Sequence, residues 1–123
     1  MENSKPIISV VIPVYNEEQT VREVIARVLA VDLGELEREV IVVDDGSTDA
    51  THRIVDDAAQ AFPGLVRAWH SPINLGKGAA VRLGFRQATG EVVIGQDADL
   101  ELDPAEFTRL LAPILSGACD VVY

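Results

Sequence analysis

The sequence predicts an α/β fold with a mainly parallel sheet, and three observations support this prediction. Short runs rich in valine and isoleucine alternate with helical segments along the 123 residues, as is typical of βαβ units. The runs are apolar at successive positions, like strands that are buried on both faces of a parallel sheet. Polar and glycine-containing segments follow the runs, at the strand ends where open parallel sheets bind their ligands.

Two strand–helix pairs are expected in the first half of the chain. The strands are residues 7–13 and 40–43, which are almost entirely apolar. The first helix follows residues 16–20, whose acidic side chains suit the positive end of a helix dipole. Its apolar positions are Val21, Val24, Ile25, Val28 and Leu29. The second helix covers residues 50–62, with residues 47–49 as its cap and a Pro-Gly pair as its end.

The second half of the chain continues the alternation. A Thr-Gly pair ends its first helix, and Pro104 suits the first turn of its second helix. The expected elements are a strand over residues 65–69, a helix over 76–88, a strand over 91–96, a helix over about 104–115 and a strand over 120–123. Because the chain stops within this last strand, we expect it to be the N-terminal part of a larger domain.

Composition excludes several classes of protein. The formal net charge is −10, whereas a general nucleic-acid surface needs basic patches. No apolar run approaches the roughly 20 residues that span a bilayer, and residues 1–6 lack a signal-peptide pattern, so a cytoplasmic location is expected. The single Cys119 excludes an internal disulfide and a cysteine-based zinc cluster.

The chemically distinctive residues gather at the predicted carboxyl ends of strands. Because these ends share one edge in an open parallel sheet, loops that are distant in sequence are expected to converge on one site. The four loops are residues 13–17, 44–49, 74–78 and 97–101.

Asp97 and Asp99 are the most informative pair in these loops. Residues i and i+2 of a strand face the same way, and two close carboxylates are costly unless a positive charge meets them. A Mg²⁺ or Mn²⁺ ion takes one or two carboxylates together with phosphate oxygens. The pair therefore indicates a metal-bridged diphosphate, although an isolated D-x-D also occurs as a solvated acidic turn.

The other loops offer contacts to a nucleotide, each with a plainer alternative. The Asp44-Asp45 pair suits the edge N–H of a nucleobase, or an Asx turn or helix cap. Tyr15 suits stacking on a base or packing within its loop, and Glu17 suits a ligand or the helix N-terminus. Gly76-Lys77-Gly78 places a cation at a helix start, where phosphate binds, but it matches neither a Walker A loop nor a Rossmann fingerprint.

The sequence assigns no functional role to the two histidines. His52 is expected on a helix surface and His70 at the end of a strand, on the surface of a loop, and neither has a partner at metal-ligand spacing in the sequence. The G-x-S-x-G elbow that would support a serine–histidine–aspartate triad is absent from the sequence.

Together, these motifs resemble family 2 glycosyltransferases with the GT-A fold. The matching segments are residues 10–17, 42–49, 74–78 and 97–99. Residues 96–104 look most like the branch that includes dolichyl-phosphate mannosyltransferase and related polyprenyl-phosphate sugar transferases. The resemblance implies a Rossmann-like nucleotide-diphospho-sugar transferase fold, with residues 1–123 as the donor-binding part of its domain.

The resemblance also implies roles for individual residues. Those expected at the nucleotide-sugar are Pro13, Tyr15, Glu17, Val43, Asp45, Lys77, Asp97, Ala98 and Asp99. Lys77 is included as a phosphate partner because of its place at a helix start. The ligands expected for a Mg²⁺ or Mn²⁺ ion are Asp97, Asp99 and Glu101; many members of the branch carry Gln at the position of Glu101.

The implied reaction is one inverting displacement at the anomeric carbon of a nucleotide-sugar donor. A polyprenyl-phosphate acceptor, at the cytoplasmic face of a membrane, needs little help from a base, whereas a sugar hydroxyl needs one. In this family the base and the acceptor groove lie beyond Tyr123, so the chain alone is expected to be inactive. Two alternatives stay open: a nucleotide-binding module without turnover, and a chain that forms a homo-oligomer through its exposed sheet edge.

Overall fold

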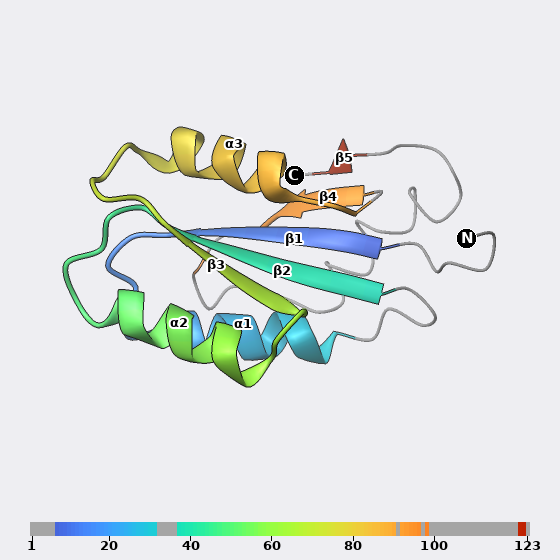
Figure 1. Ribbon diagram of the computed structural model, residues 1–123, viewed down its shortest axis with the longest axis horizontal. Helices are drawn as coiled ribbons and strands as arrows, with labels where there is room; N and C mark the ends of the chain where they lie inside the picture. Colours follow the sequence, from blue (N-terminus) through green and yellow to red (C-terminus); the bar gives the residue numbers. More distant parts are fainter. Residues whose placement is uncertain (1–6, 32–36, 91, 97, 99–120, 123) are drawn as a thin grey trace.

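A five-stranded parallel sheet forms the centre of the molecule (Figure 1). The computed structural model describes residues 7–31, 37–90, 92–96, 98 and 121–122. The strands are β1 (Ile7–Val14), β2 (Glu37–Asp44), β3 (Val66–His70), β4 (Val92–Gly95) and β5 (Val121–Val122). Their order is β3-β2-β1-β4-β5, and every pairing is parallel, which confirms the predicted class.

Helices cover both faces of this sheet (Figure 1). Helices α1 (Val21–Ala30) and α2 (Thr51–Ala61) lie on one face, and α3 (Lys77–Gln87) lies on the other. The chain builds the sheet outward from β1 through β2 to β3, and then returns to the other side of β1 with β4. This reversal of strand order beside β1 creates a switch point, where open α/β sheets bind ligands at the carboxyl ends of their strands.

Two apolar layers hold the sheet between its helices. Alternate residues of a strand face opposite sides, so Val10 of β1 packs with the α1–α2 layer whereas Val11 packs with the α3 layer. Both side chains are fully buried. The near-continuous apolar run of β1 follows from this double coverage. Among the described residues, no helix is long and apolar enough to cross a membrane.

Strand β2 is longer than the predicted 40–43, because it also includes charged residues at its start. Glu37, Arg38 and Glu39 pair with Ile7, Ile8 and Ser9 of β1. The Arg38 guanidinium donates to the carbonyls of Val28 and Val31 at the end of α1. The sequence did not indicate these pairings, since their partners are distant in the chain. The predicted helix over about 104–115 lies outside the described residues.

Glu39 is a buried acid at the amino-terminal edge of the sheet. It accepts hydrogen bonds from Ser9 Oγ at 2.7 Å, from Thr89 N at 2.7 Å and from Thr89 Oγ1 at 2.8 Å. The guanidinium of Arg67 lies 3.4 Å away. Burial raises the pKa of Glu39, but the hydrogen bonds from Thr89 and Ser9 and the charge of Arg67 outweigh it, so the pKa lies below its ordinary value.

Glu39→Gln is therefore expected to destabilise the fold in a pH-dependent way. We expect a loss of about 1–3 kcal/mol near neutral pH, because charged hydrogen bonds are broken. Because the pKa of Glu39 is lower in the folded state, its carboxylate stabilises the fold at pH values above the unfolded-state pKa of about 4.3. This contribution to the free energy of unfolding disappears as the pH falls through the folded-state pKa. The difference in urea unfolding between wild type and E39Q should thus shrink as the pH falls below about 4.3.

The matched control for this prediction is Glu23→Gln. Glu23 forms an exposed i,i+4 ion pair with Arg27, so its loss should cost less than about 1 kcal/mol. A difference between wild type and E39Q that stays constant over the acid range would contradict the assignment of the lowered pKa to Glu39.

Candidate functional site

Loops from four strands meet at the carboxyl edge of the sheet. The N–H of Asp45, after β2, donates to the carbonyl of Val14 at 2.8 Å. The N–H of Ser71, after β3, donates to the carbonyl of Asp44 at 2.8 Å. The carbonyl of Ala98, after β4, accepts a hydrogen bond from Thr20 Oγ1 at 2.9 Å. These bonds bring together the segments that the sequence placed at one edge.

A cavity of about 440 Å³ opens at this edge. Its lining residues come from the end of β1 and the loop after it, from the segments after β2 and β4, from the loop before α3 and from the start of α3: Pro13, Val14, Tyr15, Glu17, Asp45, Asn74, Gly76, Lys77, Ala80 and Ala98. Six residues predicted at the nucleotide-sugar are among them, namely Pro13, Tyr15, Glu17, Asp45, Lys77 and Ala98. The structure therefore gathers most of the predicted set around one cavity.

Of the other three predicted nucleotide-sugar residues, the structure describes only Val43. Val43 is fully buried and lines a neighbouring hollow, which also includes Asp45. Asp97 and Asp99 lie outside the described residues, as does the predicted metal ligand Glu101. The predicted metal ligands thus stay predictions.

Asp45 joins the end of β2 to the loop that precedes α3. It is only 4% exposed, and its two carboxylate oxygens accept the N–H groups of Leu75 and Gly76, each at 2.8 Å. Gly76 has a φ of 101°, in the left-handed region that favours glycine. A carboxylate oxygen has a second lone pair, so Asp45 positions this loop and still has acceptor capacity for a ligand.

Asp44 performs a different task from its neighbour Asp45. Its Oδ1 accepts the N–H of Ser47 at 2.9 Å, which is the turn-forming role that the sequence left open for one of the two acids. Its Oδ2 faces two histidines. Asp44 is 1% exposed and does not line the cavity that contains Asp45.

Asn16 links the loops after β1 and β2, a role that no local pattern in the sequence indicated. Its N–H donates to Ser47 Oγ at 2.9 Å, and its Oδ1 accepts the N–H of Thr48 at 2.8 Å. Asn16 has a φ of 50°, a conformation that asparagine tolerates better than most residues. The three residues predicted to cap α2 therefore have different roles. Ser47 and Thr48 bind Asn16, whereas Asp49 accepts the N–H of Thr51 at 2.9 Å.

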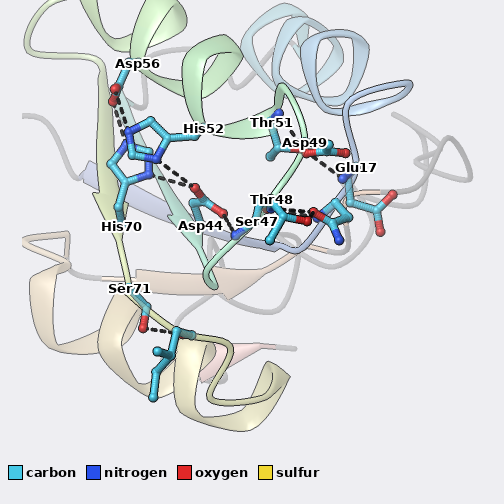
Figure 2. Close-up of polar contacts among 12 residues, drawn as sticks. Glu17, Asp44, Ser47, Thr48, Asp49, Thr51, His52, Asp56, His70 and Ser71 are labelled. Carbon is cyan, nitrogen blue, oxygen red and sulfur yellow. Dashed lines mark hydrogen bonds and ion pairs between the residues drawn. The ribbon is translucent and has the colours of Figure 1, made fainter.

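His52 and His70 form a stacked pair between two carboxylates (Figure 2). Their ring centroids lie 3.6 Å apart with planes 10° from parallel. His70 Nδ1 lies 2.8 Å from Asp44 Oδ2, and its Nε2 lies 2.6 Å from Asp56 Oδ1. Burial lowers the pKa of His70, but hydrogen bonds and charge from Asp56 and Asp44 outweigh burial, so the pKa is raised.

This pair corrects the expectation that the histidines lack partners. His52 is an exposed residue of α2, as predicted, but it lies 3.6 Å from Asp44 and 3.3 Å from Asp56. His70 pairs in register with Asp44 across β2 and β3. One sequence signal was available, since His52 and Asp56 are four residues apart on a helix. In the described part of the chain, Asp44, His52 and His70 are the group suited to a metal ion.

Comparison with known protein families identifies the family of this chain. The model of glycosyl transferase family 2 matches residues 9–123. The chain belongs to glycosyl transferase family 2. This confirms the family that the four motifs indicated.

Curated relatives of this family 2 chain lie in the expected branch. An undecaprenyl-phosphate 4-deoxy-4-formamido-L-arabinose transferase from Proteus mirabilis (strain HI4320) is 40% identical over 111 residues, which is 89% of this chain and 34% of the relative. The protein of the same name from Pseudomonas aeruginosa (strain LESB58) is 42% identical over 113 residues, which is 90% of this chain and 33% of that relative. The chain thus spans about a third of the length of these relatives.

Solved structures confirm the GT-A fold. Glucosyl-3-phosphoglycerate synthase from Mycobacterium tuberculosis, in complex with Mn²⁺ and UDP-glucose, is 29% identical with a TM-score of 0.71, and the match covers 91% of this family 2 chain and 40% of that one. A mannosyltransferase from Pyrobaculum calidifontis, in complex with GDP-Man and Mn²⁺, is 34% identical with a TM-score of 0.68. This match covers 79% of the present chain and 28% of the mannosyltransferase.

Proposed function

We propose that residues 1–123 are the donor-binding part of an inverting glycosyltransferase that transfers a sugar from a nucleotide-sugar to a polyprenyl phosphate. The observation that carries this proposal is the cavity of about 440 Å³ at the switch point of the sheet, which segments after β1, β2, β3 and β4 line together. The names of the curated relatives support undecaprenyl phosphate as the acceptor class. With such an acceptor, the whole protein would work at a membrane surface.

The nucleoside is assigned to the part of the cavity that Pro13, Tyr15 and Asp45 line. The Tyr15 side chain is 45% exposed, and an aromatic ring at a cavity wall suits stacking on a base. Asp45 retains acceptor capacity for the edge N–H of a base after it has bound Leu75 and Gly76. Pro13 is the penultimate residue of β1 and gives the cavity a rigid wall.

The diphosphate is assigned to the part of the cavity beside the start of α3. Lys77 is the first residue of this helix and lines the cavity, so its ammonium group and the helix dipole both favour an anion there. Ala98, which stands between Asp97 and Asp99 in the sequence, lines the same cavity. Its position supports Asp97, Asp99 and Glu101 as holders of Mg²⁺ or Mn²⁺, since hard cations prefer carboxylate oxygens.

Catalysis by this part of the protein consists of holding and orienting the donor. A bound divalent cation would neutralise charge on the departing nucleoside diphosphate. Lys77 would contribute further positive charge near that group, and the rigid loop held by Asp45 would keep Lys77 in place. The acceptor phosphate oxygen is already anionic and attacks the face of the anomeric carbon opposite the leaving group, which inverts its configuration. Residues for the acceptor are assigned beyond Tyr123.

Calorimetric titration of the chain with UDP-, GDP- and dTDP-sugars, with and without Mn²⁺, tests this proposal. We expect saturable binding of one donor that requires Mn²⁺. Lys77→Gln should weaken this binding by about tenfold, because a charge-assisted contact to phosphate is lost. Arg53→Gln, which removes an exposed charge from α2, is the matched control and should bind like wild type. Absence of binding for every donor in both conditions would refute the proposal.

A nucleotide-binding module without turnover is the second candidate function. The full-length protein separates the two, because only a transferase moves labelled sugar from the nucleotide to undecaprenyl phosphate. The homo-oligomer also stays a prediction, and light scattering of the chain would test it.

A further inference from the structure

We propose that Asp44, His52 and His70 form a site for a divalent transition metal of the zinc class, separate from the nucleotide cavity. The three residues come from the end of β2, from α2 and from the end of β3 (Figure 2). One ligand atom from each lies within 4.8 Å of the other two. The proposed donor site uses none of these side chains, so the two proposals stand or fall independently.

The spacing of the candidate ligand atoms fits a small tetrahedral ion. Asp44 Oδ2 lies 2.8 Å from His70 Nδ1 and 3.6 Å from His52 Nδ1. Bond lengths of 2.0–2.1 Å to zinc place neighbouring ligand atoms about 3.3 Å apart in a tetrahedron, and the two observed distances lie on either side of this value. Three protein ligands leave a fourth position for water or another ligand.

A second set of groups already orients these ligands. Asp56 lies against the opposite ring nitrogens, 2.6 Å from His70 Nε2 and 3.3 Å from His52 Nε2. A histidine that binds a metal commonly donates its other ring N–H to a carboxylate, and Asp56 provides this acceptor to both rings. The N–H of Ser47 holds Asp44 Oδ1 at 2.9 Å, which leaves Oδ2 directed at the histidines.

Access to the cluster also suits an incoming ion. A hollow of about 390 Å³ is lined by Asp44, Ser47, His52 and His70 among other residues. The His52 side chain is 54% exposed. Because the two stacked rings direct their lone pairs in parallel, one ion reaches both only when a ring turns, and the exposed ring of His52 has room to do so. Metal binding should therefore separate the stacked rings.

The ligand chemistry selects the class of metal. Imidazole nitrogens suit zinc, copper and nickel, whereas sites of carboxylate and water oxygens suit magnesium and manganese. A site with two imidazoles and one carboxylate should therefore bind Zn²⁺ in preference to Mn²⁺ or Mg²⁺. The ion would join β2, α2 and β3, and should raise the thermal stability of the chain by mass action.

The test is a calorimetric titration of the 123-residue chain with Zn²⁺, Mn²⁺ and Mg²⁺, at a pH where free imidazoles are neutral. We expect one equivalent of Zn²⁺ to bind, and His52→Gln or His70→Gln to weaken binding by about 100-fold. Asp56→Asn should weaken it by about tenfold, as for other carboxylates behind a metal-bound histidine. Asp57→Asn, the adjacent exposed acid of α2, makes the same charge change and should bind like wild type.

A measurement on the unmutated chain keeps the test independent of folding defects. Nitrogen-15 NMR should show the ring nitrogens of both histidines shifting on addition of one equivalent of Zn²⁺. No saturable Zn²⁺ binding, or undiminished binding by the His52→Gln/His70→Gln double variant, would overturn the proposal. So would histidine signals that respond to pH and not to Zn²⁺, because the cluster would then share protons only.

Discussion

Asp45→Ala is expected to abolish measurable nucleotide-sugar binding and to destabilise the chain by about 2–4 kcal/mol. The carboxylate is 4% exposed and accepts the N–H groups of Leu75 and Gly76. Its removal leaves two backbone donors unpaired and releases the loop that leads into Lys77 at the start of α3. Donor binding should fail because both the base contact and the position of Lys77 are lost. Calorimetry with the donor and urea unfolding of the free chain measure the two effects.

Asp45→Asn separates the two roles assigned to this residue. An asparagine side chain presents one acceptor and one donor group, so it accepts only one of the two N–H groups, those of Leu75 and Gly76. The Asp45→Asn variant should therefore lose less stability than the Asp45→Ala variant. Asp57→Asn provides the control for a charge change at an exposed position. Wild-type stability and donor affinity in Asp45→Ala would contradict the position of this carboxylate in the structure.

Gly46→Ala is expected to lower the free energy of unfolding by about 3 kcal/mol or more. Gly46 has a φ of 78°, and a Cβ atom there would lie 2.5 Å from the carbonyl carbon of Ile73 and 2.6 Å from the nitrogen of Asn74. These are backbone atoms of a loop that Asp45 holds through Leu75. The loop therefore cannot move away from a methyl group without breaking its own hydrogen bonds.

Gly64→Ala is a closely matched control for this substitution. Gly64 has a φ of 79° and nothing within 4 Å of a Cβ atom, so it carries the same backbone strain without the collision. Its replacement should cost only about 1 kcal/mol. Urea unfolding, followed by circular dichroism, compares the two variants directly. Equal losses would mean that backbone strain alone, and not the approach of the Ile73–Asn74 peptide, requires glycine at residue 46.

The order of the described strands and helices along the chain could be predicted from the sequence, because each of these elements carries a local signal. The run of β1 is apolar on both faces since helices cover both sides of the sheet, and this leaves a continuous pattern in the chain. The start of β2 carries no such signal. Glu39 is buried there only because Ser9 and Thr89 satisfy its carboxylate, and these partners lie 30 and 50 residues away in the chain.

The location of the candidate cavity could also be predicted from the sequence. Parallel strands place their carboxyl ends at one edge, so motifs that follow different strands had to converge there, and Tyr15, Asp45, Lys77 and Ala98 do line one cavity. The tasks of adjacent side chains were not predictable. Asp44 and Asp45 are neighbours in the chain, yet one forms a turn beside two histidines and the other anchors the loop before α3.

The amino-acid sequence by itself determined the α/β class, the family and the edge of the sheet at which the chemistry gathers, because these follow from local patterns and from the geometry of parallel strands. Tertiary structure alone decided that His52 and His70 stack between Asp44 and Asp56. This cluster depends on the register of β2 with β3 and on the packing of α2 beside them, and both are set by contacts between segments distant in the chain.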